Sequence, residues 1–180
     1  NQKGGVGKTT TTVALAGCAT KPPVASGGSA GTRSFVTTQK DCPDSFTKGP
    51  LNACQGPQCL TAVNVVWDGQ ACQLVVGAQT IQMDKTNRGA FLSWLLPTGS
   101  TWEFREESSR FALPINFTDQ NAPGLRDQFS QRMVVGNGRR VMIKNENTNG
   151  RKYEYQLRVF KVGGGPNDFI DSLDPAIQND

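Results

Sequence analysis

The feature that most limits the fold of this chain is a two-residue alternation of apolar and polar side chains in short segments. It is clearest at 110–117 and in the first eight residues of 152–162, where aromatic and aliphatic residues stand at every second position. Because successive residues of a strand point to opposite faces of a sheet, this period predicts strands with one buried face. Tight-turn sequences separate such segments at 68–69, 97–100, 136–138 and 147–150.

About eight short strands are expected, and no helices alternate with them. This pattern predicts an all-β fold, specifically an antiparallel β-sandwich. Pro114 cannot donate a ladder hydrogen bond, so the strand that contains it is expected at a sheet edge. After Gly163-Gly164-Gly165-Pro166, an acidic tail with a short segment near Ile177 is expected. Residues 35–180 are therefore predicted to form one β domain.

Composition excludes several functional classes. The chain has no histidine, which removes Ser-His-Asp and Cys-His catalysis and any zinc site with a histidine ligand. Its net charge of +4 is too small to indicate nucleic acid as the main partner. No apolar run approaches the roughly 18–20 residues of a membrane-spanning helix. We therefore expect no catalytic residues, no metal and no cofactor, and we expect any membrane association to need an anchor.

Residues 1–10 resemble the deviant Walker A loop of the ParA/MinD-like ATPases, whose pattern is K-G-G-x-G-K-[ST]. In that family glycine N–H groups surround phosphates, a lysine reaches them and a hydroxyl binds Mg²⁺. The resemblance implies a nucleotide site formed by Lys3, Gly4, Gly5, Gly7, Lys8 and Thr9. However, Pro22 and Pro23 would end the following helix early, and no later segment reads as the strand that supplies a magnesium-binding aspartate. A P-loop ATPase fragment is thus the alternative interpretation.

Leu15-Ala16-Gly17-Cys18 resembles the lipobox of bacterial lipoproteins. The resemblance implies that residues 1–17 are a signal-peptide-like segment, that Cys18 is lipidated and that the destination is the outer membrane. Residues 18–34 are rich in Gly, Ser and Pro and predict a flexible tether that reaches about 20–24 Å. A further alternative is that residues 1–17 are a start-site artefact, which would leave the later domain unchanged.

Four more cysteines lie within 31 residues of each other: Cys42, Cys54, Cys59 and Cys72. Such a cluster in a turn-rich segment favours two disulfides and an oxidising compartment. The Asp68-Gly69 turn would place Cys72 opposite Val65 rather than Cys59. We therefore prefer Cys42–Cys72 with Cys54–Cys59, while the other pairings, a four-cysteine zinc site and free thiols stay open.

Two groups of surface residues are candidates for binding. Arg139, Arg140, Lys144, Arg151 and Lys152 surround the turn at 147–150 and could face an anionic partner. They could equally form a solvated edge that deters strand pairing. Three tryptophans (Trp67, Trp94 and Trp102) could stack on sugars beside Glu103, Glu106 and Glu107, although core packing of the tryptophans and a solvated acidic patch are the simpler interpretation.

The sequence as a whole predicts an envelope-anchored, lipoprotein-like binding or structural module that makes protein–protein contacts. Its membrane contact would be the lipid anchor, and its partner a protein of the cell envelope rather than nucleic acid. The expected location is extracytoplasmic, on the periplasmic side of the outer membrane, or secreted. A secreted carbohydrate-binding domain is the second alternative.

Overall fold

The structure is a computed structural model that describes residues 38–42, 53–55, 57–106 and 114–180. In these ranges the chain forms twelve strands, a single α-helical turn and two short 3₁₀ helices, which confirms the predicted all-β class. The signal-like segment, Cys18, the tether and the Walker-like loop lie outside the described residues, as does the first half of the expected strand at 110–117.

The first sheet has the strand order β1-β2-β5-β9-β8, with β3 pairing the second half of β2. These strands are β1 (Ala53–Gln55), β2 (Gln58–Trp67), β3 (Cys72–Val76), β5 (Ala90–Leu95), β8 (Phe129–Val135) and β9 (Arg140–Asn145). β2 and β5 run parallel, whereas the other pairs are antiparallel. The sheet is therefore mixed, in contrast to the purely antiparallel arrangement expected from the sequence.

The second sheet is built around β10, its longest strand. Its strands are β4 (Thr80–Met83), β6 (Trp102–Glu103), β7 (Ile115–Phe117), β10 (Lys152–Lys161), β11 (Phe169–Asp171) and β12 (Ala176–Asn179). Their order is β11-β10-β12-β4, with β6 and β7 also paired to β10. β4 and β12 are parallel, so this sheet is mixed too. The helices are η1 (Gln39–Asp41), η2 (Lys85–Asn87) and α1 (Leu125–Gln128).

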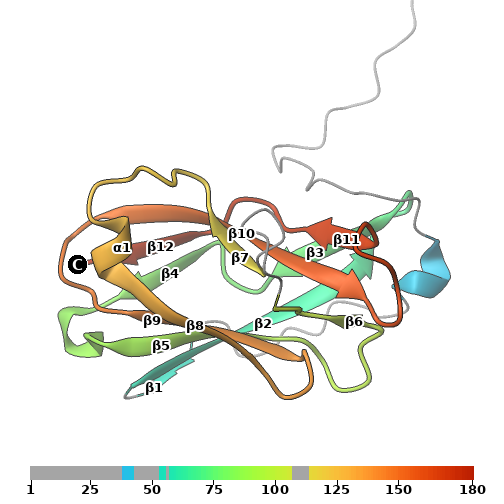
Figure 1. Cartoon of the computed structure of the whole chain (residues 1–180), viewed down its shortest axis with the longest axis horizontal. Coiled ribbons are helices and arrows are strands. Elements are labelled where there is room, and N and C mark those ends of the chain that lie inside the picture. The colour runs from blue at the N-terminus through green and yellow to red at the C-terminus, as the bar shows by residue number, and fades with distance from the viewer. Residues whose placement is uncertain (1–37, 43–52, 56, 107–113) are drawn as a thin grey trace, which may run out of the picture.

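The two sheets face each other and enclose the core, as Figure 1 shows. Alternation along β10 buries Tyr153, Tyr155, Leu157 and Val159, as predicted, because these side chains share the inner face. The Trp94 Nε1–H on β5 donates to the Tyr155 hydroxyl at 2.8 Å, which links the two sheets through a buried hydrogen bond. Burial of each large apolar side chain stabilises the fold by roughly 1.5–3 kcal/mol.

The C-terminal segment differs from the expected acidic tail. Ile170 on β11 and Ile177 on β12 are fully buried, and both strands pair with β10. β12 also pairs with β4, a strand that the sequence analysis did not identify. The turn after Gly163 therefore returns the chain to the sheet instead of releasing it.

The hairpin at Asp68-Gly69 has a different register from the one predicted. Cys72 pairs with Trp67, and Leu74 pairs with Val65. The cause is the Asp68 carboxylate, which accepts hydrogen bonds from the backbone N–H groups of Gln70 and Ala71, both at 2.8 Å. These bonds widen the two-residue turn to a four-residue loop. Cys72, Leu74 and Val76 still share the buried face, as expected.

Candidate functional site

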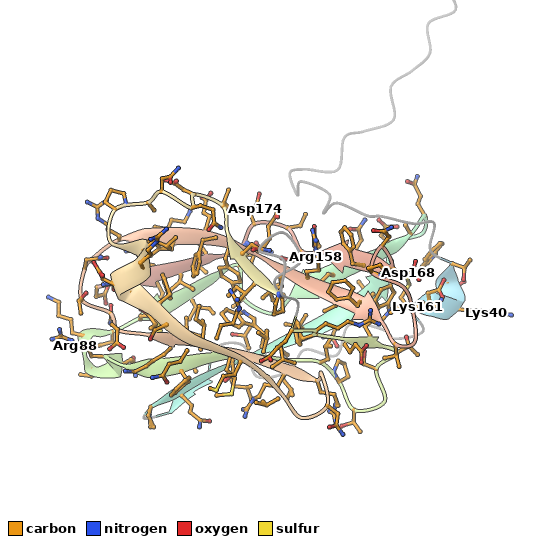
Figure 2. All side chains as sticks on the ribbon, in the orientation of Figure 1. Lys40, Arg88, Arg158, Lys161, Asp168 and Asp174 are labelled. Carbon is orange, nitrogen blue, oxygen red and sulfur yellow. A yellow bond between two sulfur atoms is a disulfide. The ribbon has the colours of Figure 1, made fainter. Side chains whose placement is uncertain are left out.

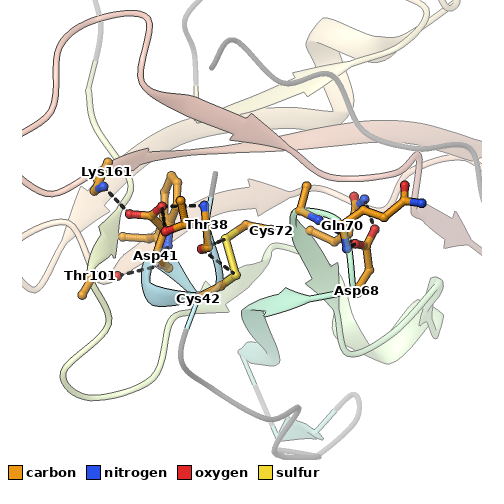
Figure 3. The surroundings of a disulfide bond; sticks show 11 residues. Thr38, Asp41, Cys42, Asp68, Gln70, Cys72, Thr101 and Lys161 are labelled. Carbon is orange, nitrogen blue, oxygen red and sulfur yellow. Dashed lines mark hydrogen bonds and ion pairs between the residues drawn. A yellow bond between two sulfur atoms is a disulfide. The ribbon is translucent and has the colours of Figure 1, made fainter. Parts of the chain in front are cut away.

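A disulfide fastens the segment that precedes the sheets to the first sheet. Cys42, just after η1, is bonded to Cys72 at the start of β3, with 5.8 Å between the two Cα atoms (Figure 3). Both cysteines are buried. This bond is the predicted Cys42–Cys72 pair, and it excludes a zinc site that uses all four clustered cysteines.

Asp41 fastens the same segment to the second sheet. Its carboxylate forms an ion pair with the Lys161 ammonium at the end of β10 and accepts the Thr38 backbone N–H at 2.7 Å. The lysine contact, followed by the Thr38 N–H, lowers the pKa of Asp41 from 3.8 to about 2. The Asp41 carbonyl accepts the Trp102 indole N–H at 2.7 Å. We call residues 38–42 with these contacts to β3, β6 and β10 the clasp.

The remaining clustered cysteines lie on the first two strands, β1 and β2. Cys59 on β2 is buried and disulfide-bonded. The register of β1 and β2 sets the backbone of Cys54 directly opposite that of Cys59. The register therefore agrees with the predicted Cys54–Cys59 pairing, which peptide mapping can test.

The five residues of the predicted basic patch are divided between the two sheets. Arg140 and Lys144 lie on the outer face of β9, whereas Arg151 and Lys152 lie at the start of β10. Arg139, in the turn before β9, donates to the Thr98 hydroxyl at 2.9 Å. Among the described residues, two of the five cations have carboxylate partners: Lys144 pairs with Glu146 at 2.7 Å, and Lys152 pairs with Glu154 at 3.3 Å.

The outer face of β5 and β9 combines cations with apolar side chains. Directly opposite residues of the two strands share a face, and here the pairs are Phe91 with Lys144, Ser93 with Met142, and Leu95 with Arg140. Phe91, Leu95, Arg140 and Lys144 are partly exposed, whereas Ser93 and Met142 are buried, so a partner can contact only the first four. We call these six residues the outer strip. The sequence pattern indicates the two cations of the strip but not their apolar neighbours on β5, because it does not show which strands pair.

The tryptophans do not form a binding platform. Trp94 and Trp102 are buried, and Trp67 packs against the core, so the simpler interpretation of these residues is correct. Two of their acidic neighbours also have partners within the protein. Glu103 pairs with Arg105 at 2.8 Å, and Glu106 accepts the Val134 backbone N–H at 3.0 Å. Glu107 lies outside the described residues.

A hollow of about 360 Å³ opens between the loop that follows β7 and the start of β10. Its walls include Phe117, Asp119, Pro123, Arg151, Tyr153 and Glu154. We call it the β7 hollow. The alternation of apolar residues places Phe117 and Tyr153 on the inner face, but it does not predict that both also line a hollow at the end of the sheet. The only signal was the polar loop at 118–131 that follows Phe117.

Two absences apply to the described ranges with their gaps. No helix there is long and apolar enough to cross a membrane. No three acidic or cysteine side chains there converge on a potential metal site. Comparison of the chain with protein-family models and with curated proteins gives no match in either case.

Proposed function

We propose that this protein is an extracytoplasmic binding module that is held to an envelope membrane through a lipid on Cys18 and contacts a protein partner. The observation that carries the proposal is the buried Cys42–Cys72 disulfide. Disulfides of this kind persist in oxidising compartments and are rare in the reducing cytosol. The lipobox-like sequence ending at Cys18 supplies the means of attachment.

The clasp supports a tethered arrangement. A chain that arrives from Cys18 continues into the clasp, where the adjacent residues Asp41 and Cys42 bind the second and the first sheet. Tension along the tether would therefore pass to β3 through a covalent bond and to β10 through an ion pair. An attachment of this kind lets a flexible segment of about 20–24 Å hold the domain without unravelling its first residues.

The outer strip is where we expect the partner to bind. Arg140 and Lys144 stand on either side of Met142 along β9, with Phe91 and Leu95 beside them on β5. Apolar contact area and cations together suit a protein whose docking face is apolar with acidic residues at its rim. Charge complementarity would then set the orientation of the bound partner, while the apolar residues would supply most of the binding affinity.

Mass spectrometry of protein purified from the native host tests the attachment. We expect the mature chain to begin at Cys18 with acyl chains on it, and we expect thiol trapping before lysis to leave Cys42 and Cys72 unlabelled. Unmodified Cys18 still joined to residues 1–17 would refute the anchor. Labelled Cys42 and Cys72 would refute the extracytoplasmic location.

Photo-crosslinking in intact cells tests the partner surface. A photoreactive residue in place of Phe91 is expected to give a defined cross-link to one envelope protein, and Arg140→Glu is expected to abolish it because the acidic rim would then be repelled. Lys40→Glu, which changes an exposed charge on η1, is the matched control. Cross-links that survive Arg140→Glu unchanged would contradict this surface.

A further inference from the structure

We propose that the β7 hollow binds an acidic saccharide, with the sugar ring against Phe117 and its carboxylate on Arg151. This inference goes beyond the protein contacts proposed above and does not depend on the lipid anchor. Its basis is the combination of a rigid aromatic wall, two carboxylates and an unpaired guanidinium around one opening. The volume of about 360 Å³ lies at the small end of ligand sites, which suits a single ring or the end of a chain.

The aromatic wall is held in place from behind. Phe117 stacks on Phe129 with 4.3 Å between ring centroids, and Tyr153 meets both rings edge-on. The Tyr153 hydroxyl donates to the Asn149 amide oxygen at 3.1 Å. Phe117 nevertheless stays partly exposed. Because this wall is already ordered, a ligand would lose little affinity to rearrangement of the protein.

The rim of the hollow offers both acceptors and donors. Asp119 uses one carboxylate oxygen to accept the Asn121 backbone N–H at 2.9 Å, and Glu154 forms its ion pair with Lys152. Each carboxylate has a second oxygen, which could accept a sugar hydroxyl. Arg151 is exposed, and in the part of the chain that the structure describes its side chain has no hydrogen bond or ion pair.

These groups match an acidic sugar better than other small ligands. The C–H face of a pyranose ring is apolar and can cover Phe117, while ring hydroxyls donate to Asp119 and Glu154. A guanidinium binds a carboxylate through two parallel N–H···O bonds, which makes Arg151 the natural partner of a uronate. A purely anionic ligand would be repelled by the two carboxylates, and a neutral sugar would leave Arg151 unused.

The position of the hollow also suits a ligand outside the membrane. In Figure 1 the loop after β7 and helix α1 lie at one end of the long axis, and η1 of the clasp lies at the opposite end. Figure 2, in the same orientation, labels Lys40 and Lys161 at the clasp end. A tether that enters at the clasp would therefore leave the hollow facing away from the anchor.

Titration with D-glucuronate, followed by amide NMR shifts of Thr118, Arg151 and Tyr153, tests the proposal on the full chain. We expect saturable shifts with glucuronate and about tenfold weaker binding of D-glucose, because the uncharged sugar lacks the charge-assisted pair. Arg151→Gln is expected to remove this preference without changing the fold, since Arg151 is exposed. Phe117→Leu is expected to weaken both sugars.

Lys40→Gln, at the clasp end, is the matched control and is expected to bind like the unmodified protein. Sodium acetate is the second control. Equal shifts with acetate would overturn the saccharide assignment in favour of a simple anion site. Failure of glucuronate to bind the folded protein, or unchanged binding in Arg151→Gln, would overturn the proposal, and neither result would bear on the lipid anchor.

Discussion

One buried hydroxyl, that of Tyr155, ties the two sheets together at the centre of the core. It accepts the Trp94 indole N–H, and burial raises the pKa of Tyr155 above its usual range, so the phenol stays neutral. The Trp94 and Tyr155 rings also pack with centroids 5.1 Å apart. The pair thus joins a specific hydrogen bond to a large apolar contact.

We expect Tyr155→Phe to lower the free energy of unfolding by about 1–3 kcal/mol, because the buried Trp94 N–H would lose its partner. Denaturant unfolding measures this change. Tyr153→Phe is the control, because its hydroxyl lies at the edge of the core and bonds an amide near solvent, so a smaller loss is expected. Equal losses in the two variants would show that the hydrogen bond between the sheets contributes no more to stability than the Tyr153 hydroxyl does.

Asp41 makes the clasp sensitive to acid. Its pKa is 3.8 in the unfolded chain and about 2 in the folded protein, where Lys161 and the Thr38 N–H favour the carboxylate. A depressed folded pKa contributes stability above pH 4, and this contribution is lost as the pH falls from about 4 to about 2. We expect Lys161→Met to reduce the change in the free energy of unfolding between about pH 4 and about pH 2.

The control for that measurement is Lys152→Met, which removes a lysine of an exposed pair on the same strand. Exposed pairs contribute little to stability, so the free energy of unfolding of this variant is expected to depend on pH as it does in the unmodified protein. An unchanged slope in Lys161→Met would contradict the assignment of this pH dependence to the clasp.

At the scale of elements, β12 completes the second sheet between β10 and β4. Ile177 is fully buried, and Asn179 exchanges amide hydrogen bonds with Asn145 on β9 of the first sheet at 2.8 and 3.4 Å. Truncation before Ala176 would remove this strand and expose the edges of both neighbours. We expect such a chain to aggregate rather than fold, because unpaired strand edges template association.

Size-exclusion chromatography of the truncated chain measures that outcome. Removal of Asp180 alone is the control, because this exposed last residue contributes only a backbone N–H to the Met83 carbonyl. A monomeric, cooperatively folded protein without residues 176–180 would show that β12 is dispensable.

The sequence pattern predicts some of these elements well and others not at all. β10 is identified correctly because the eight residues from Lys152 to Val159 alternate without interruption. β4, β11 and β12 have only three or four residues each, too few for a period to be recognised. The parallel pairing of β2 with β5 could not be predicted either, because alternation fixes which face is buried but not which strand lies alongside.

The same limit applies to the candidate sites. The Cys42–Cys72 bond follows from cysteine spacing and the turn between the strands, although the predicted register of that turn was wrong. The β7 hollow could not be predicted, because it depends on where β7 ends relative to the start of β10. Phe117 and Tyr153 carry the pattern of core residues, and only the assembled sheet reveals that they reach its end.

At the scale of the whole molecule, the disulfide and the Asp41–Lys161 pair hold one short segment against both sheets. The disulfide joins residues 30 positions apart, and closing a loop of that length stabilises a folded protein by about 3–4 kcal/mol. Two restraints on the same residues do not act independently. While Cys42 is bonded to Cys72, Asp41 stays near Lys161 whatever its own charge.

The double variant Cys42→Ser/Cys72→Ser therefore tests the clasp as a unit. We expect it to fold at neutral pH with lower stability by about 3–4 kcal/mol, because the ion pair and the Trp102 hydrogen bond still hold residues 38–42. Below pH 2, where Asp41 is protonated even in the folded state, we expect this segment to be released in the variant alone, so that amide exchange at Asp41 and Cys42 rises sharply there and little in the bonded protein. If exchange rises equally in both, the disulfide does not restrain the segment, and the clasp would have only polar contacts to resist tension along a tether.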